Sequence, residues 1–285
     1  ANLTFMSGVT QITNSGPLAV SDSTATGQLD LVNDDRIQLA AITATGQTAN
    51  ITAGGEISDT NGAATNITAT TLNLMGGEDV TDIETMVSTL SLVTADTSIN
   101  NGNIALELTD TVLTGDLDLT TGNTLVLNEI AGAGYDVYIM AGGEISDGDG
   151  GAAVNVTAEA LTIAGNVDVT SIETDVEELQ LTTAATSITN TGMLFVEDST
   201  VTGQLDLTND AATYLGTIDA TGQVVNLMVT GGGVFDDNLD SGSTDLTTNI
   251  TATTLNITGD MAVTRIDTAV SHLVLETAAS SMTNS

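Results

Sequence analysis

An apolar frame that recurs three times constrains the fold of this chain more than any other feature. The stretch 80–92, VTDIETMVSTLSL, returns twice with its apolar residues at the same positions, while the residues between them change. The three sets are Val80, Ile83, Val87, Leu90 and Leu92; Val169, Ile172, Val176, Leu179 and Leu181; and Val263, Ile266, Val270, Leu273 and Leu275. A fixed frame with variable filling is the mark of one structural unit copied along a solenoid or array.

Other segments repeat in step with this frame. GQLDLVND from Gly27 returns as GDLDLTTG from Gly115 and GQLDLTND from Gly203, and both steps are 88 residues. The chain opens and closes at the same phase, so we expect it to be an excerpt of a longer array. We predict one continuous solenoid over 1–285, with copies at approximately 1–87, 88–176 and 177–270 and a further copy starting at 271–285.

Short alternations of apolar and polar residues indicate the fold class. They are separated by Asn-Asp, Thr-Gly-Gln and Gly-Gly clusters, which is typical of strands of about three to six residues that end in bends. Matching strands fall near Leu29, Ile51, Leu72 and Leu90 before the pattern restarts at Leu117. We therefore predict an all-β parallel β-helix with about four rungs per copy, each of about 20 residues.

A helix is the alternative for the stretch 80–92. Val80, Ile83, Val87 and Leu90 are spaced by 3, 4 and 3 residues, which is a helical spacing. Thr and Asp crowd the same window, and the frame ends in the alternation of Leu90 and Leu92, which favours a strand.

Charge limits the partners of the chain. The net charge is −36, from 38 acidic residues against Arg36 and Arg265. Nucleic acid and anionic membrane surfaces are excluded as ligands because both require cationic side chains. Cationic surfaces and bridging divalent cations remain as partners.

Apolar runs and cleavage sites bear on the location of the chain. No apolar run approaches the length of about 18 residues that a spanning helix needs, so we expect no membrane insertion. The scarcity of tryptic sites fits an extracellular or cell-surface location.

No residue pattern predicts catalysis. His272, the only histidine, occupies the position of Thr89 and Glu178 in the other copies, and Arg265 replaces Asp82 and Ser171. A solvated surface imidazole is the simpler interpretation, and we assign no catalytic residue and no cofactor.

Two sets of recurring carboxylates have structural explanations. Glu56 recurs as Glu144 but becomes Gly233 in the third copy. Glu84, Glu173 and Asp267 share one position, where we expect an acidic side chain to cap backbone amides at a corner.

The insertion in the third copy is the corner most open to specialisation. It carries Asp236, Asp237, Asp240 and Asp245, and such hard oxygen ligands suit calcium. No EF-hand or GGxGxD nonapeptide is present, so an acidic solvated loop is favoured and we assign no metal site.

Two threonine-rich motifs leave further alternatives open. Asn-x-Thr sequons occur at Asn2, Asn50, Asn66, Asn155, Asn249 and Asn256. Thr-x-Thr triplets lie at 24–26, 43–45, 68–70, 200–202 and 251–253, and they resemble the ranks of ice-binding solenoids. The triplets are unevenly spaced along the first copy, which argues against one triplet on each rung.

With GGEISD, NITATTLNL, DIETMVSTLSL and TSITNTG in view, the whole chain resembles the repeat shafts of filamentous-haemagglutinin-like bacterial adhesins. That resemblance implies a right-handed parallel β-helix and an extracellular structural or adhesive fibre that is not an enzyme. It also implies end-to-end association or continuation of one giant chain, and contact with a host, neighbouring-cell or glycan surface. The alternative is a solenoid that binds calcium, glycan or ice.

Overall fold

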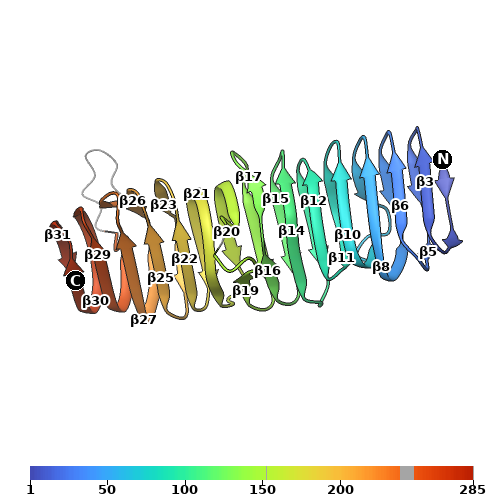
Figure 1. The fold of residues 1–285 in the computed structure, drawn as a ribbon. Coiled ribbons are helices and arrows are strands. Elements are labelled where there is room, and N and C mark those ends of the chain that lie inside the picture. Colours follow the sequence, from blue (N-terminus) through green and yellow to red (C-terminus); the bar gives the residue numbers. More distant parts are fainter. Residues whose placement is uncertain (152, 238–246, 285) are drawn as a thin grey trace. The chain divides into compact units, whose positions relative to one another are not determined.

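The computed structural model describes residues 1–151, 153–237 and 247–284, and over these ranges the chain is all-β, with parallel strands and no helix (Figure 1). The chain divides into two compact units, Ala1–Gly143 and Glu144–Ser285, and each is described by itself below. No helix of the described residues is long and apolar enough to cross a membrane.

The N-terminal unit contains eighteen strands, most of them short. They are β1 (Asn2–Leu3), β2 (Met6–Ser7), β3 (Thr10–Asn14), β4 (Leu18–Val20), β5 (Ser23–Ala25), β6 (Leu29–Asn33), β7 (Ile37–Leu39), β8 (Ile42–Ala53), β9 (Ile57–Asp59), β10 (Ile67–Gly76), β11 (Val80–Met86), β12 (Thr89–Thr94), β13 (Thr97–Asn101), β14 (Leu106–Leu113), β15 (Leu117–Thr121), β16 (Leu125–Leu127), β17 (Ile130–Gly132) and β18 (Val137–Ala141).

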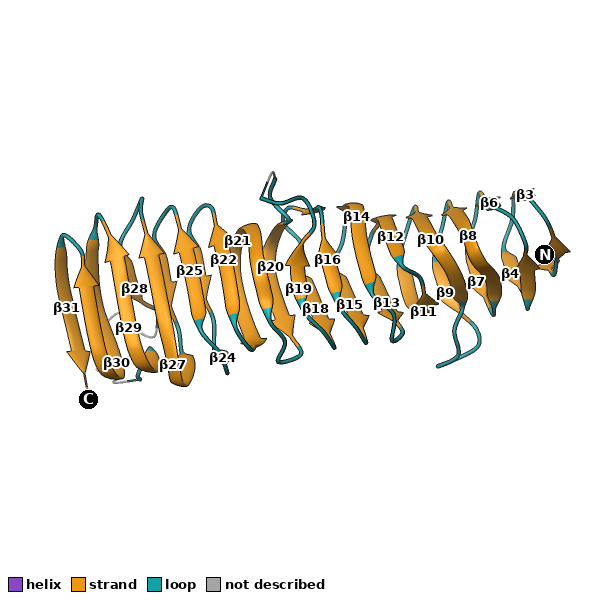
Figure 2. Cartoon of the chain, turned by 60° about the horizontal axis from the view of Figure 1, so that its bottom comes forward, coloured by secondary structure: helices purple, strands orange, loops and turns teal. Residues whose placement is uncertain are grey.

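The C-terminal unit contains the remaining described strands, which are drawn from another side in Figure 2. They are β19 (Ile145–Asp147), β20 (Val156–Ala164), β21 (Val169–Thr183), β22 (Thr186–Asn190), β23 (Leu194–Val196), β24 (Ser199–Val201), β25 (Leu205–Asn209), β26 (Thr213–Leu215), β27 (Ile218–Val229), β28 (Val234–Asp236), β29 (Ile250–Gly259), β30 (Ala262–Glu276) and β31 (Ala279–Asn284).

Each unit is a stack of coils in which a strand pairs with the equivalent strand one coil away. In the N-terminal unit Leu31 pairs with Ile51, Ile51 with Leu74, and Leu74 with Leu92, all in parallel register. None of these side chains is more than 1% exposed. Successive coils therefore lie about 4.8 Å apart and pile aliphatic side chains into a narrow core. The stack is consistent with the predicted right-handed parallel β-helix.

The helical interpretation of the stretch 80–92 is wrong. It forms β11 and β12, and its five frame residues are at most 1% exposed. The helix-like spacing of Val80 and Ile83 arises from a β-bulge, in which Asp82 adopts a φ of 52°. Ser171 and Arg265, at the same position of the later copies, have φ values of 55° and 62°.

One copy of the repeat contains the expected four turns and an additional part of a turn. Leu29 pairs with Ala49, Ala49 with Leu72, Leu72 with Leu90, and Leu90 with Leu108, which completes four turns. Leu117, the sequence counterpart of Leu29, belongs instead to a column with Thr97, Val80 and Ile57. Leu29 and its counterpart Leu117 therefore lie on different sides of the N-terminal coils.

Candidate functional site

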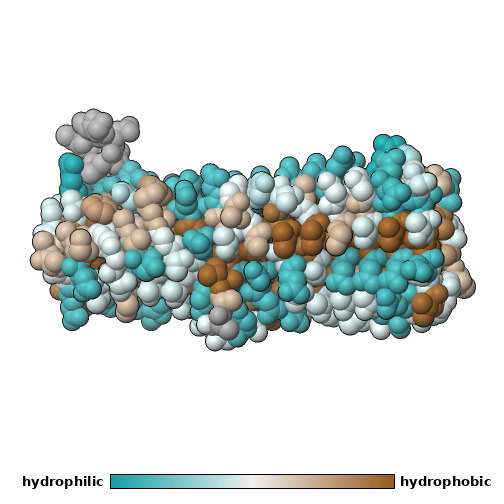
Figure 3. Space-filling model, turned by 45° about the horizontal axis from the view of Figure 1, so that its top comes forward, coloured by the Kyte–Doolittle hydropathy of each residue, from teal (hydrophilic) through white to brown (hydrophobic). Residues whose placement is uncertain are grey.

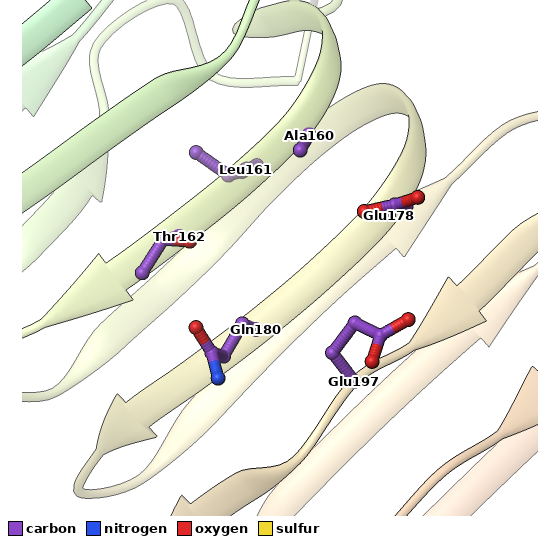
Figure 4. Close-up of a pocket in the computed structure, with 6 residues that line it drawn as sticks. All are labelled: Ala160, Leu161, Thr162, Glu178, Gln180 and Glu197. Carbon is purple, nitrogen blue, oxygen red and sulfur yellow. The ribbon is translucent and has the colours of Figure 1, made fainter. Parts of the chain in front are cut away.

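A shallow groove lies on the surface of the C-terminal unit. It has a volume of about 290 Å³ and is formed where β20, β21 and β23 lie side by side (Figure 4). Its lining consists of Ala160, Leu161, Thr162, Glu178, Gln180 and Glu197. Side chains of alternate residues project outward from a strand, which brings Glu178 and Gln180 of β21 to the same surface.

The groove is acidic, and its surroundings raise the pKa of one of its carboxyls. Burial raises the pKa of Glu197 above its ordinary value, and the negative charges of Glu178, Asp237 and Asp198 raise it further. The side-chain amide of Gln180 donates to the Asp198 carbonyl at 3.1 Å, which fixes that amide. The arrangement offers two carboxyls to a cation or to the hydroxyls of a ligand.

An aromatic stack begins beside this groove and was not expected from the sequence. Phe195 pairs in register with Tyr214, and Tyr214 with Phe235, on three successive coils. Their ring centroids are 4.7 Å and 5.2 Å apart and the rings are nearly parallel. Tyr214 follows Phe195, and Phe235 follows Tyr214, by about one coil length in the sequence, and this spacing is the signal that could have revealed the stack. Because the rings cover one another's faces, the stack exposes mainly ring edges.

The corner that carries the recurring acidic residue is organised by a buried asparagine instead. The Asn66 side chain is fully buried and donates to the Leu39 carbonyl at 3.1 Å and to Asp59 Oδ1 at 2.6 Å. In return Asn66 Oδ1 accepts the backbone N–H of Glu84 at 2.8 Å. At Glu84 the asparagine oxygen accepts the backbone N–H from the next coil, and Glu84 Oε2 is buried without a hydrogen-bond partner, so this oxygen does not cap an amide as expected.

The same arrangement occurs at both later copies of this corner. Asn155 Oδ1 accepts the backbone N–H of Glu173 at 2.9 Å, and Asn249 Oδ1 accepts that of Asp267 at 2.9 Å. The oxygen Glu173 Oε2 is buried and unpartnered, like its counterpart in the first copy.

Two carboxyls of this corner are shifted in opposite directions. Burial raises the pKa of Glu84, and the negative charge of Asp59 raises it further. Burial would also raise the pKa of Asp59, but hydrogen bonds from Asn61, Asn66 and Gly62 outweigh it and lower that pKa. Glu173 and Asp147 repeat the pattern in the second copy, with raised and lowered pKa values respectively.

The isolated ionisable residues of the sequence lie apart on the surface. His272 is exposed on β30 and pairs in register with Thr254. Arg265 and Arg36 are also exposed. Glu56 and Glu144 each accept a hydrogen bond from a threonine one coil away, Thr81 at 3.4 Å and Thr170 at 2.7 Å.

The acidic insertion can be described only in part. Asp236 Oδ1 accepts the Asn249 side chain at 2.7 Å, which ties the carboxylate into the asparagine corner. Asp240 and Asp245 lie outside the described residues. Within the described ranges, no group of three or more His, Cys, Asp or Glu side chains could hold a metal ion.

Five of the six sequon asparagines are engaged in the coils. Asn66, Asn155 and Asn249 are fully buried, and Asn50 and Asn256 donate to Asp30 Oδ1 and Asn226 Oδ1 in ladders between coils. Asn2 is exposed.

The threonine triplets of the first copy align better than their spacing suggested. Thr24 pairs with Thr43, and Thr43 with Thr68, so the triplets share one side of three successive coils. The argument from uneven spacing was wrong because the loop between β9 and β10 absorbs the additional residues. The column of threonines ends at Met6, which pairs with Thr24, and at Met86, which pairs with Thr68. In the C-terminal unit Asp219 separates Thr200 from Thr251.

Comparison with protein-family models, curated proteins and solved structures finds no match to this chain.

Proposed function

We propose that this protein is an extracellular structural or adhesive fibre of a microbial cell surface, with a solenoid shaft as its working part and no enzymatic activity. The observation that carries the proposal is the uninterrupted pairing of coils inside each unit. In the N-terminal unit the column from Leu18 through Ile37, Ile57, Val80, Thr97 and Leu117 to Val137 is paired at every step. A stack of this kind resists bending and stretching because every coil is hydrogen-bonded to its neighbours.

The surface supports the same role. The net charge of −36 keeps such shafts soluble and apart from one another. Each coil also satisfies its strand edges on the coils above and below, so lateral aggregation through exposed edges is suppressed along the shaft.

Electron microscopy of the native material tests the proposal. Fibres with the width of one coil, projecting from the cell surface, are the expected result. Compact particles, or a location inside the cell, would contradict the proposal that the protein forms a fibre.

Protease treatment provides a second test. Trypsin can cut only at Arg36 and Arg265, and Arg265 lies within the paired strand β30. The folded protein should stay intact under conditions in which the urea-unfolded chain is cut at both sites. Rapid cleavage of the folded protein would show that the coils open too readily for a durable shaft.

Ice binding is a second candidate because Thr24, Thr43 and Thr68 stack in register. A flat rank of threonines is the feature that an ice-binding face requires, and this rank spans three coils. Thermal hysteresis measured on the purified protein, and its loss in Thr43→Lys, would support this candidate. No hysteresis at high protein concentration would leave the rank as part of the shaft surface.

A further inference from the structure

An exposed apolar stripe runs along one side of the N-terminal unit. Val32, Thr52, Met75, Val93 and Val112 follow one another in register on successive coils. The exposed fractions of Val32, Met75, Val93 and Val112 are 37%, 50%, 38% and 46%. Figure 3 shows hydrophobic surface gathered in a row between hydrophilic bands. We call the four side chains Val32, Met75, Val93 and Val112 the apolar stripe.

An acidic ladder runs parallel to the stripe. Each member directly precedes one residue of the paired column Ile57, Val80, Thr97, Leu117 and Val137. The members are Glu56, Asp79, Asp96, Asp116 and Asp136, and all but Glu56 are exposed. Five carboxylates therefore follow one another about 4.8 Å apart along the axis, and they repel one another. The ladder ends at Glu56, because Arg36 occupies the equivalent position before Ile37 one coil earlier.

The stripe and the ladder share the same coils and the same corner. Asp79 follows Met75 by four residues, Asp96 follows Val93 by three, and Asp116 follows Val112 by four. Four residues span at most about 14 Å, so an apolar side chain and a carboxylate lie within that reach on each coil. The surface is amphipathic along its length, with one apolar edge and one anionic edge.

The later coils of the C-terminal unit, residues 205–284, lack both features at the corresponding positions, whereas its first two coils keep the carboxylates Glu144 and Asp168 before Ile145 and Val169. The column that corresponds to the stripe contains Thr208, Met228, Thr258 and Glu276, of which only Met228 is apolar. The residues that correspond to Glu56, Asp79 and Asp96 are Gly233, Ala262 and Ala279. Because these later coils have the same architecture without the stripe or the ladder, the coil itself does not require either feature.

We propose that this corner of the N-terminal unit binds a cationic amphipathic α-helix of a partner protein, laid along the solenoid axis. The charge complementarity is direct: the ladder attracts lysine or arginine on one flank of the helix while the stripe covers its apolar face. A helical turn advances 5.4 Å and a coil about 4.8 Å, so successive turns meet successive coils with a drift of about 0.6 Å each. A second copy of this chain fits poorly because its own charge is also strongly negative.

A binding titration tests the proposal on the whole chain. The probe is a fluorescein-labelled peptide of about 18 leucine and lysine residues with helical amphipathic spacing, followed by fluorescence anisotropy. The variant Met75→Thr/Val93→Thr/Val112→Thr should weaken binding at least about tenfold. The variant Asp79→Asn/Asp96→Asn/Asp116→Asn should weaken it at low salt and reduce its salt dependence. Asparagine keeps the oxygens by which Asp96 and Asp116 accept backbone N–H groups of the next coil.

Matched variants of the C-terminal unit serve as controls. Glu159→Gln/Asp175→Asn/Glu177→Gln removes the same charge from exposed positions, and Met228→Thr removes an exposed methionine. Both should bind the peptide as the parent does, and circular dichroism should show that all variants fold. Equal loss in the controls would overturn the proposal, as would equal binding of a lysine peptide without the apolar face. A stripe-dependent dimer in sedimentation velocity would identify a second copy as the occupant and likewise overturn it.

Discussion

Asn66 and Glu84 lie on adjacent coils and are joined by a hydrogen bond in which the Glu84 backbone N–H donates to Asn66 Oδ1 at 2.8 Å. The same contact, at the same positions, recurs as Asn155 with Glu173 and as Asn249 with Asp267. Each asparagine follows a loop of different length between two strands. The bond therefore returns the chain to register after the loop, whatever the length of the loop.

Loss of this asparagine should destabilise the coil. Asn66→Ala leaves the buried N–H of Glu84 without its side-chain acceptor, at a cost of about 1–3 kcal/mol. The melting temperature from circular dichroism should fall clearly. Asn2→Ala, at an exposed asparagine, is the control and should leave it unchanged.

The contribution of the Glu84 carboxyl to stability should change with pH in the opposite direction from that of most acidic groups. The pKa of Glu84 is raised by burial and by Asp59, so its charged form weakens the fold at neutral pH, and its contribution improves as the pH falls and the carboxyl becomes protonated. Glu84→Gln should therefore raise the melting temperature at neutral pH, and the gain should shrink in acid. A gain that is independent of pH would show that the charge is not the cause.

Asp59 should behave as the counterpart of Glu84. Its pKa is lowered by hydrogen bonds that it accepts, so its carboxylate stabilises the fold at neutral pH and that contribution is lost as the pH falls. Asp59→Asn should lower the melting temperature at neutral pH and have less effect in acid. The two substitutions should thus have opposite signs at neutral pH, although the residues share one corner.

The bulge position offers a substitution that should stabilise the fold. Arg265 has a φ of 62°, and an ordinary side chain in this conformation costs about 1–2 kcal/mol. Arg265→Gly should raise the melting temperature, while Asp82→Gly should do so less because aspartate tolerates the conformation better. Equal effects at both positions would contradict the assignment of strain to the arginine side chain.

Glycosylation should be confined by the hydrogen bonds of the sequon asparagines. Produced in a glycosylating host, the folded protein should carry glycan at Asn2 and not at Asn66, Asn155 or Asn249, which are buried. Peptide mapping by mass spectrometry checks this. Substantial occupancy at Asn66 in folded material would contradict the asparagine corner.

The core could be predicted from the sequence because its frame is local and repeated. Val80, Ile83 and Leu90 were identified by their recurrence, and all three are buried. The aromatic stack and the aligned threonines were missed because they depend on which residues face each other one coil away. Coil length varies with each loop, so that register cannot be obtained from a single average spacing. The contact between Phe195 and Tyr214 can be predicted only if the chain between them is known to form one turn.

The asparagine of the acidic corner was missed for a similar reason. Glu84 drew attention in the sequence because it recurs with Glu173 as a charged residue. The residue that accepts the backbone N–H is Asn66, 18 positions earlier on the adjacent coil. The chain contains many asparagines, and the buried ones differ from those of the surface ladders only in which groups the coils place around them.

Spin labelling tests the in-register winding most directly. The chain has no cysteine, so Ser98→Cys/Asp118→Cys and Ser187→Cys/Asp206→Cys can each be labelled at two chosen sites. Both pairs are in register on adjacent coils although their members are far apart in the sequence. Electron paramagnetic resonance should show strong spin–spin interaction in both doubly labelled proteins, because the backbones are about 4.8 Å apart. Spectra equal to the sum of the singly labelled proteins would contradict the parallel solenoid.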